Sequence, residues 1–184
     1  MWASEPRRIL GVASAAAAFS ALAARFWWVN DDAFIAFRYG RSWVEGRGIT
    51  FNPGESPPVE GYTDFLWVVL SALCESLGAN PAFWMPLLSF ACGLALLVLL
   101  HRILDERLGL RPPVPALATL WLACLPPLAL WSSSGLETMP FALLILLAFD
   151  RFVLLVDPRS ARAAAVLALL LSLLRFDGIA FAIL

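Results

Sequence analysis

Residues 9–29 read ILGVASAAAAFSALAARFWWV, an apolar run directly behind the basic pair Arg7 and Arg8. A helix of this length reaches roughly 30 Å, which is enough to cross the hydrocarbon core of a lipid bilayer. Trp27 and Trp28, near the end of the run, have the amphipathic rings that favour a membrane interface. The run therefore predicts a first transmembrane helix.

A cleaved signal peptide is the alternative interpretation of this run, because Ala21-Leu22-Ala23 resembles a cleavage site. The apolar residues continue past that site to the two tryptophans, which favours a retained helix. In either case, we expect the chain from Asn30 onward to emerge on the outer face of the membrane.

The composition supports a membrane protein. Hydrophobic residues make up 61% of the chain and charged residues 15%, with a mean hydropathy of +0.80. Soluble domains carry about 25% charged residues, so lipid must be the solvent for much of this chain. The net charge of −1 argues against a nucleic-acid partner, which would need a basic surface.

Further apolar runs predict an all-α, polytopic transmembrane helix bundle with about five spans and the start of a sixth. Residues 65–77 (FLWVVLSALCESL) would reach only about 20 Å and include Glu75, so they predict an interfacial or re-entrant helix. The remaining predicted spans are 82–104, 114–131, 139–156, 161–174 and a truncated span at 179–184. Because the chain stops inside that last run, we expect residues 1–184 to be the N-terminal part of a single, larger transmembrane domain.

The distribution of arginine predicts the topology. The connections 101–113 and 157–162 contain arginine, which places them and the N-terminus in the cytoplasm by the positive-inside rule. This topology is consistent only if residues 65–77 do not cross the membrane. The segments then expected outside are the loop 30–81 and the short connections 132–138 and 175–178.

The strongest candidate for chemistry is the acidic pair Asp31–Asp32 at the outer end of the first helix. Helix capping is the structural alternative, but capping needs only one carboxylate. Ionisable groups at a membrane boundary are functional candidates by default. One carboxylate could act as general base toward a hydroxyl, and the pair could hold a divalent cation such as Mg²⁺ or Mn²⁺.

Three weaker motifs share the predicted outer side. The loop carries Asn52-Pro53-Gly54-Glu55 and Glu60-Gly61-Tyr62-Thr63, and with Trp67 these residues would suit a sugar, although an ordinary polar turn is the simpler interpretation. Glu137 is the only charge in residues 134–138 (SGLET), where it could merely begin a helix. Arg175 and Asp177 could form a simple charge pair, or Arg175 could hold a phosphate.

These motifs resemble a known family. The segments Asp31-Asp32-Ala-Phe-Ile-Ala-Phe-Arg38-Tyr39, Phe51-Asn52-Pro53-Gly54-Glu55 and Glu60-Gly61-Tyr62-Thr63-Asp64, with Trp67, are similar to those of the terminal arabinofuranosyltransferases of the mycobacterial cell wall and their bacterial relatives. These are membrane glycosyltransferases of the GT-C class. The segments 134–138 and 175–178 match later, shorter motifs of the group. The positions of Asp64 and Phe176 depart from the usual Asn and Pro.

The resemblance implies an inverting transferase in a bacterial cytoplasmic membrane, with an extracytoplasmic active site. Its donor would be a polyprenyl-phosphate-linked sugar, with arabinofuranose as one candidate, and its acceptor a cell-envelope glycan or glycolipid. Asp31 would be the general base, and Asp32 would orient it or bind acceptor or metal. The implied substrate-binding residues are Arg38, Tyr39, Asn52, Glu60, Tyr62, Thr63, Trp67, Glu137, Arg175 and Asp177. The piece 1–184 could be inactive by itself.

Two other functions compete with the transferase. A transporter or flippase of lipid-linked sugars would place charges within the spans, where Arg25 and Asp150 are the candidates. A structural membrane subunit would leave the acidic pair and the loop motifs without a role. The sequence therefore ranks the transferase first.

Overall fold

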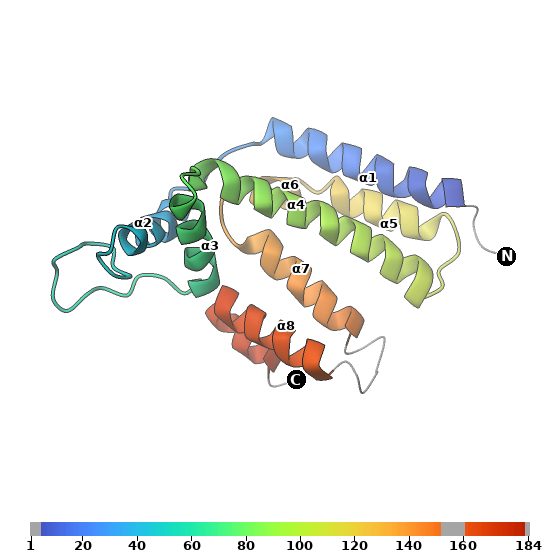
Figure 1. Cartoon of the computed structure of the whole chain (residues 1–184). Helices are drawn as coiled ribbons and strands as arrows, with labels where there is room; N and C mark the ends of the chain where they lie inside the picture. The colour runs from blue at the N-terminus through green and yellow to red at the C-terminus, as the bar shows by residue number, and fades with distance from the viewer. Residues whose placement is uncertain (1–4, 152–160, 183–184) are drawn as a thin grey trace.

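The computed structural model describes residues 5–151 and 161–182, and these residues form helices and no strands. Figure 1 shows the arrangement. The longer helices are α1 (Glu5–Arg25), α2 (Ala33–Val44), α3 (Phe65–Ser76), α4 (Pro81–Arg102), α5 (Val114–Ala123), α6 (Pro126–Ser132), α7 (Thr138–Phe149) and α8 (Ala161–Leu174). A π-helical turn, η1 (Ile103–Arg107), extends α4, and a 3-10 segment, η4 (Phe176–Ala182), follows α8.

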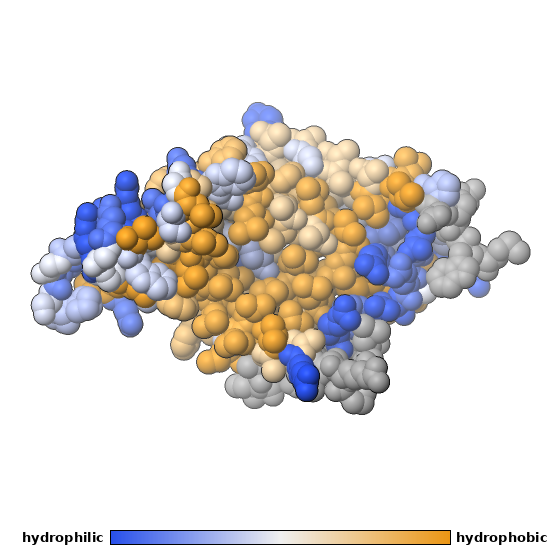
Figure 2. Space-filling view, in the orientation of Figure 1, coloured by the Kyte–Doolittle hydropathy of each residue, from blue (hydrophilic) through white to orange (hydrophobic). Residues whose placement is uncertain are grey.

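The helices form an elongated bundle with a polar region at each end. Helices α1, α4 and α5 run side by side, α7 and α8 lie below them, and α2 and α3 cap the left-hand end in Figure 1. Figure 2 shows an apolar band between these hydrophilic ends. This pattern is typical of a protein that places its middle in lipid and its ends in water.

Within residues 5–151 and 161–182, two helices satisfy the length and hydropathy that a membrane crossing needs, at Arg8–Arg25 and Pro81–Arg107. A third crossing results if the bent pair α5 and α6 is one span. The prediction of about five spans is therefore supported only in part. Helices α3, α7 and α8 are apolar but shorter, and the predicted span residues 152–156 lie outside the described part of the chain.

The predicted span 114–131 is broken rather than straight. Helix α5 ends at Ala123, α6 begins at Pro126, and the two axes differ by 60°. The cause is the pair Pro126–Pro127, since proline lacks the N–H that a continuous helix would use. This proline pair was the signal in the sequence that the prediction of a single run overlooked.

Two other predicted boundaries also change. The helix predicted at 9–29 ends at Arg25, and the following chain turns so that Trp28 donates to the carbonyl of Leu130 at 3.2 Å. Of the truncated span predicted at 179–184, residues 179–182 are instead part of η4, which folds back onto α8, and residues 183–184 lie outside the described part of the chain. A Cβ at Gly178 would overlap the carbonyl oxygen of Leu171, so glycine permits this close return.

Small residues let the first two spanning helices approach closely. The ring of Phe19 on α1 stacks on Phe90 of α4 with centroids 5.3 Å apart, and it is fully buried. A Cβ at Gly93 would come within 2.6 Å of the same ring. In lipid, such van der Waals packing is a main source of helix association.

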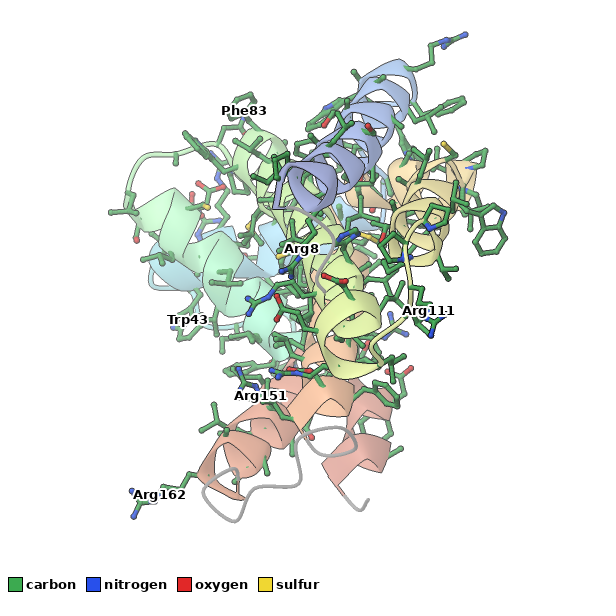
Figure 3. All side chains as sticks on the ribbon, turned by 90° about the vertical axis from the view of Figure 1, so that its right-hand side faces the viewer. Arg8, Trp43, Phe83, Arg111, Arg151 and Arg162 are labelled. Carbon is green, nitrogen blue, oxygen red and sulfur yellow. The ribbon has the colours of Figure 1, made fainter. Side chains whose placement is uncertain are left out.

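The end opposite α2 and α3 is rich in arginine, as the predicted cytoplasmic side requires. Figure 3 looks onto this end and shows Arg8, Arg111, Arg151 and Arg162 around it. Arg8 pairs with Asp105 at 2.6 Å, and Arg107 donates to the buried carboxylate of Asp150 at 3.0 Å. Among the described residues, Arg8, Arg111, Arg151 and Arg162 thus share one end of the bundle.

Candidate functional site

The acidic pair stands exposed at the start of α2. Asp32 occupies the N-cap position, but its carboxylate makes no capping hydrogen bond. Its backbone N–H instead donates to Oδ1 of Asn30 and Oδ1 of Asp31, both at 3.1 Å. Helix capping therefore does not account for Asp32, and both carboxylates face solvent.

The backbone beside the acidic pair is fixed to the α6–α7 connection. The carbonyl of Ser134 accepts from the N–H of Asn30 at 2.8 Å. The next carbonyl, of Gly135, accepts from Nε1 of the fully buried Trp67 at 2.8 Å. The third, of Leu136, accepts from Oγ of Ser89 at 3.2 Å. Three segments that are distant in the sequence thus donate to three consecutive carbonyls. The α6–α7 connection therefore holds together the end of the bundle that carries α2 and α3.

Gly135 allows the connection to present its carbonyls in this way. Its φ is +81°, a left-handed conformation that residues with a Cβ rarely adopt. A Cβ there would also approach the side chain of Ala33 to 3.1 Å. The glycine in the predicted motif at 134–138 is therefore required by both the backbone conformation and the close approach of α2.

Glu137 and Arg175, two predicted site residues, are in direct contact. Nη1 of Arg175 donates to Oε1 of the buried Glu137 at 2.7 Å. Nε of the same guanidinium donates to Oδ1 of Asp177 at 3.0 Å, and its carbon lies 5.4 Å from the ring centroid of Phe141. The pair Arg175 and Asp177, two positions apart in the sequence, is thus one part of a larger cluster.

Asp64 is a fourth member of this cluster that the predicted site omitted. Burial raises the pKa of its carboxyl from 3.8 to about 6, with a further contribution from the charge of Glu137, while Arg175 opposes the shift. Asp64 is the N-cap residue of α3, three positions before Trp67. In the sequence, Asp64 is an acidic residue directly before an apolar helix. An ordinary N-cap residue has the same pattern, so the sequence does not distinguish the two.

Tyr39 of α2 and Tyr62 of the following loop form an aromatic contact next to this cluster. The hydroxyl of Tyr39 donates to the carbonyl of Val59 at 2.7 Å and accepts from the N–H of Gly61 at 2.8 Å. Its ring meets that of Tyr62 edge-on at 4.7 Å. Burial, followed by the charge of Glu60, raises the pKa of Tyr62. Tyr39 therefore acts as a structural anchor for the loop.

The remaining predicted residues lie on α2 and further out on the loop that follows it. Nε of Arg38 donates to the carbonyl of Phe51 at 3.1 Å, and the amide of Asn52 donates to Glu55 at 3.1 Å. Glu60 and Thr63 are exposed. The structure thus separates the predicted residues into a cluster around the buried Glu137 and an exposed set on α2 and the loop.

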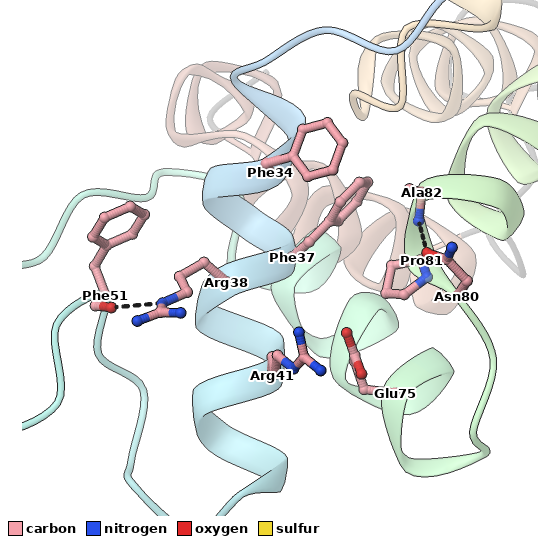
Figure 4. Close-up of a pocket in the computed structure, with 9 residues that line it drawn as sticks. All are labelled: Phe34, Phe37, Arg38, Arg41, Phe51, Glu75, Asn80, Pro81 and Ala82. Atoms are coloured by element: carbon pink, nitrogen blue, oxygen red, sulfur yellow. Dashed lines mark hydrogen bonds between the residues drawn. The ribbon is translucent and has the colours of Figure 1, made fainter.

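A groove of about 430 Å³ opens between α2 and the start of α4. Figure 4 shows its lining residues: Phe34, Phe37, Arg38, Arg41, Phe51, Glu75, Asn80, Pro81 and Ala82. Asp31 lies in the turn before α2 and is not among the residues that line the groove. Apart from Arg38, these lining residues were not among the predicted site residues.

No group of three or more His, Cys, Asp or Glu side chains within 5–151 and 161–182 is placed to hold a metal ion. The acidic pair offers two exposed carboxylates, and Oδ1 of Asp31 already accepts from the N–H of Asp32. A divalent cation on Asp31 and Asp32 remains a prediction.

The comparisons with known proteins give no relative. A scan against protein-family models, a search of curated proteins and a search of solved structures each returned no match.

Proposed function

We propose that this chain belongs to a membrane glycosyltransferase that moves a sugar from a polyprenyl-phosphate donor to a cell-envelope glycan or glycolipid. Asp31 is the general base in this proposal, and arabinofuranose is one candidate for the sugar. The observation that carries the proposal is the α6–α7 connection, which binds Asn30 beside the acidic pair and continues directly into Glu137. A candidate base and a candidate phosphate-binding arginine thereby share one end of an apolar bundle.

The proposed transfer requires both the Asp31 carboxylate and the Arg175 guanidinium. The Asp31 carboxylate accepts the proton of the acceptor hydroxyl, whose oxygen attacks the anomeric carbon of the donor. The bond from that carbon to the phosphate oxygen breaks, and the polyprenyl phosphate departs with the electron pair. Arg175 stabilises the charge that develops on the leaving phosphate. Attack opposite the leaving group inverts the anomeric centre.

The contacts of Arg175 agree with such a role. Glu137 holds the guanidinium from its buried side, whereas Asp177, whose side chain is 64% exposed, holds it from the solvent side. A phosphate that displaces Asp177 would gain two N–H donors in the fork geometry that suits it. Glu137 would keep the arginine in position during the exchange.

The transporter alternative has less support from the charges. Asp150 lies at the C-cap of α7 and pairs with Arg107 at the arginine-rich end. Arg25 lies in the last turn of α1, near the other end of the bundle. Neither charge occupies the middle of a described span, where a transport site would be expected.

Transfer of labelled sugar from a polyprenyl-phosphate donor, measured in membranes that contain the full-length protein, tests the proposal. We expect Asp31→Asn to reduce transfer by at least about a hundredfold, the lower range for loss of a general base. Glu55→Gln is the control, because Glu55 is an exposed carboxylate of the same loop. Equal transfer by the wild type and Asp31→Asn would remove Asp31 from the chemistry. Movement of donor between leaflets without transfer would favour the transporter.

A further inference from the structure

The groove between α2 and α4 has a mixed chemistry that the proposed reaction does not use. Arg38 and Arg41 lie one turn apart along α2 and line one wall. Glu75 and Asn80, from the end of α3 and the start of α4, line the other. Two guanidinium groups against one carboxylate give the groove a net positive charge, so its occupant should be an anion.

The guanidinium groups are held in place but remain accessible. Nε of Arg38 donates to the carbonyl of Phe51 at 3.1 Å, and Figure 4 shows its guanidinium turned toward Phe51. Arg41 reaches Glu45 at 3.6 Å, a long ion pair on a side chain that is 61% exposed. Figure 4 shows Arg41 turned toward Glu75 across the groove.

The groove lies at the level of a membrane interface. Pro81 and Ala82 form part of its wall and begin the candidate span Pro81–Arg107. The next two residues, Phe83 and Trp84, are 57% and 48% exposed, as expected for aromatic side chains in an interfacial belt. Lipid headgroups occupy this level of the bilayer.

A second, apolar groove borders the same α3–α4 turn. It also measures about 430 Å³, and it is lined by Leu70, Leu73, Cys74, Leu77, Ala79, Trp84, Met85 and Leu88. Glu75 and Asn80 in the polar groove are the direct neighbours of Cys74 and Ala79 in the apolar one. A polar and an apolar groove on one turn provide the two environments that an amphiphile needs.

We propose that the α2–α4 groove binds the headgroup of an anionic phospholipid of the surrounding bilayer. Arg38 and Arg41 contact its phosphate, the rings of Phe34 and Phe37 cover its glycerol, and its acyl chains lie in the apolar surroundings of the α3–α4 turn. This site is separate from Arg175, and the proposal does not depend on the transferase.

The test measures lipid retention by the purified full-length protein. The protein is exchanged into an equimolar mixture of phosphatidylglycerol and phosphatidylcholine in detergent, and the bound lipid is measured by mass spectrometry. We expect the wild type to retain phosphatidylglycerol preferentially. Arg41→Gln should reduce that preference by about fivefold, the effect of one basic residue near an anionic lipid surface, and Arg38→Gln should do the same.

Two variants separate charge from folding. Arg41→Lys keeps the charge and should keep most of the preference. Arg47→Gln removes a neighbouring arginine that pairs with Glu45 at 2.8 Å but does not line the groove, so it should leave the preference unchanged. Equal retention of the two lipids by the wild type, or a preference that survives both glutamine variants, would overturn the proposal.

Competition identifies the source of the phosphate. Soluble glycerol phosphate at the same concentration should not displace the lipid, because it lacks the chains that hold the lipid in place. Displacement by glycerol phosphate would make this a site for free phosphate. Displacement by polyprenyl phosphate at equal concentration would make it a part of the donor site. Either result would contradict a bilayer lipid as the occupant.

Discussion

Arg175 donates from Nη1 to Oε1 of Glu137 over 2.7 Å, although 38 positions separate the two residues in the chain. The contact joins the segment after α8 to the first residue before α7. Glu137 is buried, whereas the side chain of Arg175 is 40% exposed. The pair therefore lies at the boundary between the apolar bundle and the polar end.

Loss of either partner should destabilise this boundary. We expect Arg175→Gln to lower the free energy of unfolding by about 1–2 kcal/mol, because it leaves the Glu137 carboxylate buried without its cation. The loss should be smaller than for a fully buried pair, since Arg175 retains solvent contact. A thermal melt in detergent measures the effect. Asp177→Asn is the control and should change stability by less than about 0.5 kcal/mol, because that carboxylate is exposed.

Asp64 should make stability depend on pH. Its folded-state pKa of about 6 lies above the ordinary 3.8, so in this window the folded protein binds its proton more tightly than the unfolded chain does. The free energy of unfolding should therefore fall as the pH rises through the window, by on the order of 1–2 kcal/mol after allowance for partial solvation. Melts across this range should show the slope.

Asp64→Asn should flatten that slope, whereas Glu55→Gln, in the exposed part of the same loop, should leave it in place. A slope of unchanged size in Asp64→Asn would show that another group is responsible.

Trp67 should be the most sensitive tryptophan of the polar end. Trp67→Phe removes the donor to the Gly135 carbonyl, which is buried, and should cost about 1–3 kcal/mol. It should also reduce sugar transfer, because the α6–α7 connection would lose one of its three attachments. Trp43→Phe is the matched control, as Trp43 is 40% exposed on α2. Equal melting temperatures for the two variants would mean that this hydrogen bond contributes nothing.

Gly93 should tolerate no larger residue. Gly93→Val would force the side chain against Phe19 and separate α1 from α4, with a loss of about 1–3 kcal/mol. Ala95→Val adds bulk to an exposed position of the same helix and should be nearly neutral. The melting temperatures of the two variants test this prediction, and equal losses would contradict it.

The topology leads to a labelling experiment. A cysteine introduced at Gly109, between the arginines of the α4–α5 connection, should react with a membrane-impermeant reagent only after the cells are opened. A cysteine at Glu55, in the exposed loop, should react in intact cells, measured in a background that lacks the natural cysteines. Reaction at position 109 in intact cells would place the α4–α5 connection outside the cell and would contradict the proposed orientation.

The sequence predicted the helical elements well where hydropathy alone defines them. The apolar helix predicted at 65–77 is confirmed, and the structure places it at Phe65–Ser76. This helix could be recognised because glycine and proline interrupt the chain on both sides of it. The number of spans was predicted less well, because hydropathy does not show where an apolar run bends or stops.

The composition of the cluster around Glu137 could be predicted only in part. Glu137, Arg175 and Asp177 were identified as separate short motifs, and their contact depends on how α7 and α8 pack. Asp64 was not expected among them, because only the fold reveals that an acidic residue before α3 approaches Glu137. The groove was missed for the same reason: its two walls come from α2 and from the α3–α4 turn.

The central proposal is that Arg175, held in place by Glu137, binds the phosphate of a polyprenyl-phosphate donor. A photoreactive polyprenyl-phosphate sugar, cross-linked to the full-length protein in membranes and mapped by peptide sequencing, tests it most directly. The account predicts cross-links in residues 134–141 and 175–178 that are lost in Arg175→Gln and retained in Arg47→Gln. Cross-links confined to the arginine-rich end around Arg107, or a pattern indifferent to Arg175, would contradict it.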